Sequence, residues 1–276
     1  MKKAVKFSKQ LFEKAMEVDV FGMAAQLAYF FLLSLFPFLL FLVTLIGYLR
    51  LEEQKVISFI GAYAPGEIVT LIESNISQLV NEQNGGLLSI GIIGTIWSAS
   101  AGINAIMKAF NVAYEVEEDR SFIVARLIAI VLTIAMVVVI CMAFLLPIFG
   151  KMIGEYLFSF FGWSNNFLQV WNTLRWVVSS VVFFIVLLAL YKLAPNLRVI
   201  FKDAIWGAIF ATIGWQLVSL AFSYYVSSIG NYSATYGSLG TVITLMIWFY
   251  ISGIIIVIGG VINATIKQRR VGRLET

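Results

Sequence analysis

The segment from Ala24 to Tyr48 constrains the fold of this chain more than any other part of the sequence. Its 25 residues, AAQLAYFFLLSLFPFLLFLVTLIGY, include no charged side chain. A helix needs roughly 20 mostly apolar residues to cross the hydrocarbon core of a bilayer. The segment therefore predicts a transmembrane helix.

One side of this predicted helix is polar. At about 100° per residue, its polar residues and its proline fall within less than half of the helix circumference. They are Gln26, Tyr29, Ser34, Pro37, Thr44 and Tyr48. An unpaired amide or hydroxyl is costly in hydrocarbon, so we expect this face to contact other helices or a hydrated space.

Further apolar segments follow, in a chain that is 61% hydrophobic and only 12% charged. These fractions are far from those of soluble domains. The predicted spans cover approximately residues 24–48, 87–110, 122–148, 170–190, 204–229 and 239–266. The sequence thus predicts one all-α domain over residues 1–276, a polytopic membrane protein with six transmembrane helices.

The connections on one side of the membrane are expected to contain amphipathic helices. Residues 52–84 are too many for a tight turn, and after Pro65-Gly66-Glu67 apolar residues recur at helical spacing until Gly85-Gly86. Proline and an acidic residue are favoured in the first turn of a helix. Such a helix either lies on the outer surface of the membrane or only covers the bundle. Residues 151–161 have a similar pattern.

The distribution of basic residues predicts the orientation. Of the 19 Lys and Arg residues, 15 fall on the side of the two termini and four on the opposite side. The positive-inside rule then places both termini in the cytoplasm. The near balance with 15 Asp and Glu residues gives no support for a nucleic-acid partner, and membrane lipids are the expected partners.

The fifth and sixth predicted spans also carry polar stripes at helical spacing. Together with the first span, they predict a shared interior cavity. Its expected lining is Gln26, Tyr29, Ser34, Pro37, Gln216, Ser219, Ser223, Thr244, Trp248, Ser252 and Asn263. The alternative is that the same residues only form hydrogen bonds between helices.

Two features of the sequence suggest movement. Pro37 removes a backbone donor inside the first span, so we expect a kink near residues 33–37. The uncharged loop of residues 230–238 holds the candidates for an outer gate, Tyr232, Ser233, Tyr236 and Gly237. The alternative for this loop is a rigid turn between the last two helices.

Several kinds of chemistry lack their residues. The chain has no His, and no Asp or Glu lies deep in a predicted span. Zinc sites with imidazole ligands, Ser-His catalysis and intramembrane aspartyl catalysis are therefore not expected. No P-loop or dinucleotide fingerprint occurs, and we interpret the acidic run at 115–119 as a solvated loop rather than a metal site. No catalytic residue, metal or cofactor is predicted, and the protein is not expected to be an enzyme.

A combination of short motifs spread over nearly the whole chain resembles the YihY/BrkB family of bacterial inner-membrane proteins, once labelled ribonuclease BN. The motifs are Gln26-Leu27-Ala28-Tyr29-Phe30, Ser34-Leu35-Phe36-Pro37, Trp97, Asn111-Val112-Ala113-Tyr114, Arg120, Pro195-Asn196, Gly207, Tyr232-Ser233, Tyr236-Gly237-Ser238-Leu239-Gly240, Trp248 and Asn263-Ala264. The resemblance implies a multi-pass protein of the bacterial plasma membrane. It also implies either transport of envelope lipids or their precursors, or cation/proton antiport. Val261 stands where many family members have a glutamate, so a mechanism that needs this carboxylate is not expected here.

These observations lead to one functional hypothesis with two alternatives. Polar helix faces without buried carboxylates favour a transporter or flippase-like protein for an amphiphilic substrate, a lipid or lipid precursor, that is not driven by ATP on its own. The alternatives are a cation/proton antiporter and a structural or assembly protein whose polar faces hold the helices together.

Overall fold

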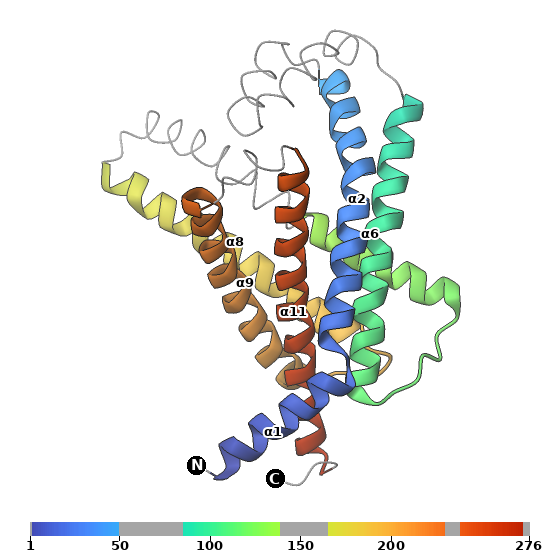
Figure 1. Ribbon diagram of the computed structural model, residues 1–276, viewed down its shortest axis with the longest axis vertical. Helices are drawn as coiled ribbons and strands as arrows, with labels where there is room; N and C mark the ends of the chain where they lie inside the picture. The colour runs from blue at the N-terminus through green and yellow to red at the C-terminus, as the bar shows by residue number, and fades with distance from the viewer. Residues whose placement is uncertain (1, 50–84, 139–164, 230–237, 273–276) are drawn as a thin grey trace. The chain divides into compact units, whose positions relative to one another are not determined.

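The computed structural model describes residues 2–49, 85–138, 165–229 and 238–272, and nearly all of them are helical. The labelled helices in Figure 1 are α1 (Lys2–Glu17), α2 (Val20–Leu49), α6 (Gly85–Tyr114), α8 (Asn165–Leu193), α9 (Phe201–Ile229) and α11 (Ser238–Arg270). A further apolar helix covers Phe122–Val138. No strand occurs among these residues. The predicted all-α membrane fold is confirmed.

Every predicted span coincides with one of these helices where the chain is described. Four helices contain segments long and apolar enough to cross a membrane: Val20–Phe41, Gly85–Tyr114, Phe201–Tyr225 and Val242–Arg270. The apolar parts described at Phe122–Val138 and Val177–Leu193 are shorter. The count of six spans therefore stays a prediction. The predicted amphipathic segments at 52–84 and 151–161, and the gate residues Tyr232, Ser233, Tyr236 and Gly237, lie outside the described residues.

Helix α1 was not among the predicted elements. It ends at Glu17, and two residues later Asp19 has a φ of 51°, in the left-handed region. The Asp19 carboxylate accepts a hydrogen bond from the backbone N–H of Gly22 at 3.2 Å, as an N-cap does. Asp19 thus lies in the turn after α1 and caps α2.

The described chain divides into two compact units, residues 31–99 and residues 1–30 with 100–276. In the smaller unit, α2 and α6 approach through glycines. A Cβ at Gly91 would lie 2.8 Å from the backbone nitrogen of Phe41, and one at Gly94 would lie 3.0 Å from Cβ of Pro37. Small residues allow such close approach where no water drives helices together. Helix α2 continues through Pro37, and the kink predicted there stays a prediction.

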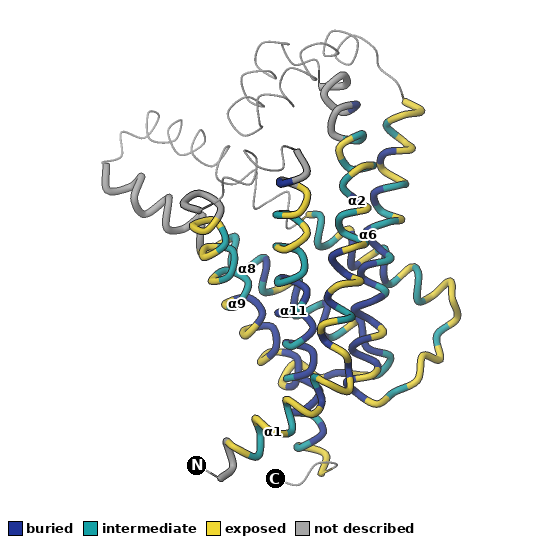
Figure 2. The backbone as a smooth tube through the Cα atoms, viewed as in Figure 1, coloured by how far each residue is buried: buried dark blue, intermediate teal, exposed yellow. Residues whose placement is uncertain are grey.

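In the larger unit, the core is built around the C-terminal half of α11. Gly259 and Gly260 make room there for bulky neighbours, because a Cβ at these positions would overlap the rings of Tyr191 and Phe110, respectively. Those two rings lie 5.3 Å apart between centroids. Figure 2 shows this half of α11 as its buried part.

Candidate functional site

The contact between α9 and α11 depends on Asn263, a residue of the predicted cavity. Its side chain is fully buried. Its Oδ1 accepts a hydrogen bond from the backbone N–H of Gly207 at 2.6 Å, and its Nδ2 donates to the carbonyl of Ala204 at 3.1 Å. A Cβ at Gly259 would lie 2.9 Å from the carbonyl oxygen of Gly207. Here the two helix backbones nearly touch, and Asn263 forms hydrogen bonds across them.

Nearer the N-terminus of α11, the predicted polar stripes meet in pairs. Trp248 donates its indole N–H to the hydroxyl of Ser219 at 3.3 Å, which joins α11 to α9. Gln216 donates to the hydroxyl of Ser180 at 2.9 Å, which joins α9 to α8. The sequence analysis singled out three of these four residues and missed Ser180.

Beside these contacts, a groove of about 360 Å³ lies between α8 and α9. Its lining is Val177, Ser180, Val181, Phe184, Ile209, Thr212 and Ile213. The side chains of Val181 and Ile213 are exposed, whereas Thr212 is only 8% exposed and its hydroxyl has no hydrogen-bond partner among the described residues. The groove is therefore mostly apolar, reaches the helix surface and has two hydroxyl-bearing residues in its lining.

The other residues of the predicted cavity are placed less uniformly. Ser252 is buried on α11 and its hydroxyl has no partner in the described chain, while Thr244 is half-buried and Ser223 is exposed. Gln26 and Tyr29 are exposed on α2. Ser34 is buried and donates to the carbonyl of Phe31 in its own helix at 2.7 Å, and Pro37 lies beside Gly94. The shared cavity stays a prediction.

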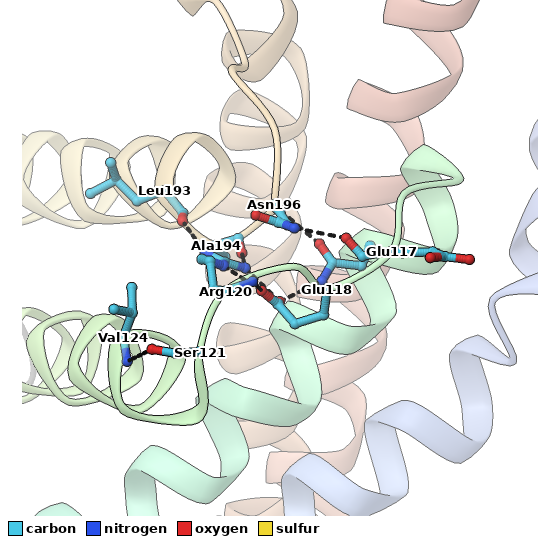
Figure 3. Close-up of polar contacts among 9 residues, drawn as sticks. Glu117, Glu118, Arg120, Ser121, Val124, Leu193, Ala194 and Asn196 are labelled. Carbon is cyan, nitrogen blue, oxygen red and sulfur yellow. Dashed lines mark hydrogen bonds and ion pairs between the residues drawn. The ribbon is translucent and has the colours of Figure 1, made fainter.

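A second group of polar residues gathers where α6 and α8 end. Arg120 lies between Glu118 and the last carbonyls of α8 (Figure 3). Its guanidinium donates to both carboxylate oxygens of Glu118, at 2.5 and 2.7 Å, and to the carbonyl of Ala194 at 2.9 Å. The last carbonyls of a helix lack internal partners and carry partial negative charge, so Arg120 satisfies them. The same hydrogen bonds from Arg120 lower the pKa of the Glu118 carboxyl.

Two asparagines complete this group. The Oδ1 of Asn111 accepts the backbone N–H of Asn196 at 2.7 Å, and its Nδ2 donates to Glu118 at 2.7 Å. Asn196 donates its side-chain amide to the carbonyl of Glu117 at 2.7 Å. Asn111, Arg120 and Asn196 all belong to the motifs on which the family resemblance rests, and the structure joins them into one network that links the loops at 115–121 and 194–200.

A buried lysine attaches α1 to the same region. Lys14 is only 5% exposed, and its ammonium donates to Glu115 at 2.5 Å and to Gln268 at 2.7 Å. The sequence analysis counted Lys14 only among the 15 basic residues on the side of the two termini. Its spacing was the available signal, because Phe7, Leu11, Lys14 and Val18 share one face of a helix. Nearby, the buried Asp203 in the first turn of α9 pairs with Arg270 at 2.8 Å.

Among the residues that the structure describes, no group of three or more Cys, Asp or Glu side chains is placed to hold a metal ion. The acidic run at 115–119 instead supplies hydrogen bonds to Lys14, Arg120 and Asn196. The polar interactions among the described residues are thus hydrogen bonds of amides and hydroxyls, together with ion pairs. This chemistry suits binding and helix association.

Comparisons with known proteins agree with this architecture. The chain is 53% identical over 264 residues to YfkH of Bacillus subtilis, named a ribonuclease-like protein, and the match covers 96% of both chains. It is 26% identical over 250 residues to a UPF0761 membrane protein of Alteromonas mediterranea, covering 89% of this chain and 82% of the relative. No solved structure matches. Residues 11–276 match the family described as virulence factor BrkB, and this chain belongs to that family of membrane proteins.

Proposed function

We propose that this protein binds an amphiphilic substrate, a lipid or lipid precursor, and moves it between the two leaflets of the membrane. The groove between α8 and α9 is the observation that supports the proposal most. Its walls of Val, Ile and Phe side chains suit an acyl chain, and its hydroxyls at Ser180 and Thr212 suit a polar group. A buried hydroxyl without a partner is costly in hydrocarbon, so a substrate that supplies an acceptor gains affinity there.

The polar residues that follow the groove extend this surface. Gln216 and Ser219 lie one and two turns beyond Thr212 on α9, and they bond Ser180 and Trp248 from the neighbouring helices. A polar head group passing between the leaflets needs such partners at a depth where lipid tails offer none. The orientation with both termini in the cytoplasm, in the inner membrane of a bacterium, belongs to the same proposal.

Cation/proton antiport has less support. Proton-coupled transport usually depends on carboxylates or histidines within the membrane. In the described part of the chain, the buried carboxylate is Asp203, which lies in the first turn of α9 and is paired with Arg270. Val261, at the position where the resemblance would allow a glutamate, is fully buried.

The test is reconstitution of the full chain into liposomes that carry fluorescent phospholipids in one leaflet, with ion-sensitive dyes in parallel. We expect lipid movement that Thr212→Val slows by about fivefold, the effect of roughly one hydrogen bond. The matched control is Thr133→Val, because the Thr133 hydroxyl is buried but bonds within its own helix to the carbonyl of Ala129.

Each outcome distinguishes the hypotheses. Lipid movement that Thr212→Val slows and Thr133→Val leaves unchanged would support the groove as the path. Ion flux coupled to a pH gradient, without lipid movement, would replace the proposal by antiport. Absence of both over several lipid compositions would leave the structural or assembly role, in which contacts such as Gln216 to Ser180 only hold helices together.

A further inference from the structure

A second cavity lies at the polar end of the larger unit, next to the network of Asn111, Arg120 and Asn196. Its volume is about 270 Å³, and it is lined by Tyr114, Val116, Leu197, Lys267, Gln268 and Val271. These residues come from the end of α6, from the two loops that the network joins, and from the end of α11. The cavity is separate from the groove between α8 and α9, with which it shares no lining residue.

Among the residues of this lining, Tyr114 carries an unusual group, its hydroxyl. Tyr114 is 3% exposed, and its hydroxyl has no hydrogen-bond partner among the described residues. Buried hydroxyl groups are normally bonded, because leaving one unpaired costs the full penalty of removing it from water. Tyr191 shows the normal case in the same core, since its hydroxyl donates to the carbonyl of Ile256 at 2.8 Å.

The charges around the cavity favour a negatively charged occupant. Two carboxylates at this end of the unit have cationic partners, Asp203 with Arg270 and Glu115 with Lys14. The charged residue in the lining is Lys267, whose ammonium lies 5.5 Å from the centre of the Tyr114 ring and donates to the carbonyl of Arg198. Tyr114 and Lys267 thus both line this cavity, and the ammonium lies beside the tyrosine ring.

The rest of the lining limits what kind of anion fits. Val116, Leu197 and Val271 contribute apolar surface, while the amide of Gln268 is already engaged with Lys14 and Glu115. The volume is just below the roughly 300 Å³ at which sites for drug-sized ligands begin. A small charged group attached to a short carbon segment fits this description, and a whole lipid does not.

We propose that this cavity binds the phosphate of a phospholipid head group or of a small soluble phosphate. The Tyr114 hydroxyl donates to a phosphate oxygen, Lys267 balances its charge, and the apolar residues contact the adjacent carbon atoms. Hydrogen bonds to charged acceptors are among the stronger ones in proteins. The site is independent of substrate movement through the groove between α8 and α9, so either proposal can fail without the other.

The test uses the full chain in detergent and measures its melting temperature while one of three probes is added. The probes are inorganic phosphate, dihexanoyl phosphatidylglycerol and dihexanoyl phosphatidylcholine. Ligands that bind only the folded state raise the melting temperature. We expect phosphate or phosphatidylglycerol to do so, and Tyr114→Phe and Lys267→Gln each to weaken the apparent affinity by about tenfold, as loss of a charge-assisted hydrogen bond would.

The control is Tyr191→Phe, which removes the same atom from the hydroxyl bonded to Ile256. This variant is expected to melt earlier and yet to keep its response to the probe. Tyr114→Phe removes a hydroxyl without a partner, so it is expected to fold as well as the original chain. A response to phosphatidylglycerol alone would identify a lipid head group, and a response to phosphate as well would identify the phosphate itself.

Three results would overturn the proposal. The first is no rise in melting temperature with either anionic probe, which would mean that the cavity holds only water. The second is an unchanged response of Tyr114→Phe. The third is an equal response to phosphatidylcholine and phosphatidylglycerol that Lys267→Gln leaves unchanged, since the phosphate that both lipids carry would then not be held by this lysine.

Discussion

Replacing Asn263 by alanine tests whether the contact between α9 and α11 stabilises the fold. The substitution removes two hydrogen bonds, to the N–H of Gly207 and the carbonyl of Ala204. Hydrogen bonds between membrane helices average about 0.6 kcal/mol each and reach about 1.7 kcal/mol. Because Asn263 is fully buried, we expect the upper part of that range, a loss of about 2–3 kcal/mol in the free energy of unfolding.

Unfolding in mixed micelles titrated with a denaturing detergent, followed by circular dichroism, measures this loss. The control is Asn104→Ala, the same change at a half-buried position of α6. A second variant, Gly207→Ala, places a methyl group 2.7 Å from Cγ of Asn263 and also against the carbonyl of Gly259. If Asn263→Ala costs no more than the control, or if its effect simply adds to that of Gly207→Ala, the residues are not coupled and the argument is refuted.

Two further predictions concern other parts of the chain. Arg120 lowers the pKa of Glu118 in the folded state. The stabilisation from this pair is therefore complete above the pKa of about 4.3 that a glutamate has in the unfolded chain, and it is lost as the pH falls through the lower pKa of Glu118 in the folded chain. The difference in melting temperature between the original chain and Arg120→Gln should be constant near neutral pH and narrow in acid; a difference that does not depend on pH would contradict the assignment. Gly91→Val should lower the free energy of unfolding by about 1–3 kcal/mol, because the new side chain meets the backbone of Phe41. The control is Gly86→Val, at an exposed glycine of the same helix, and equal melting temperatures of the two variants would disprove the prediction.

Hydropathy was sufficient to locate the long helices. The predicted span 204–229 became α9 at Phe201–Ile229, and 87–110 became α6 at Gly85–Tyr114. Long apolar segments can adopt few structures in a membrane, since only helices and closed barrels provide hydrogen-bond partners for all their backbone groups there. Helix α1 was missed for the opposite reason: its many charged residues hid the periodicity that packs Lys14 and Val18 against the rest of the unit.

The candidate site was predictable only in part, because helical spacing shows which residues share a face and not which helix that face meets. Spacing placed Gln216 and Asn263 on polar stripes, and both do form bonds between helices. It gave no indication of Ser180 as the partner of Gln216. The pairing of Asn111 with Asn196 joins residues 85 positions apart, and no local pattern encodes such a distance.

The close approach of Gly207 and Gly259 limits how this protein can change shape. A shift of α9 along α11 by a single residue would move it by about 1.5 Å and would bring a side chain to the place where only a hydrogen atom fits. The two helices therefore have to move together as one rigid body. Any opening and closing has to take place at other helix–helix interfaces. The interface between α8 and α9 has larger side chains and a groove in which those side chains have space to rearrange.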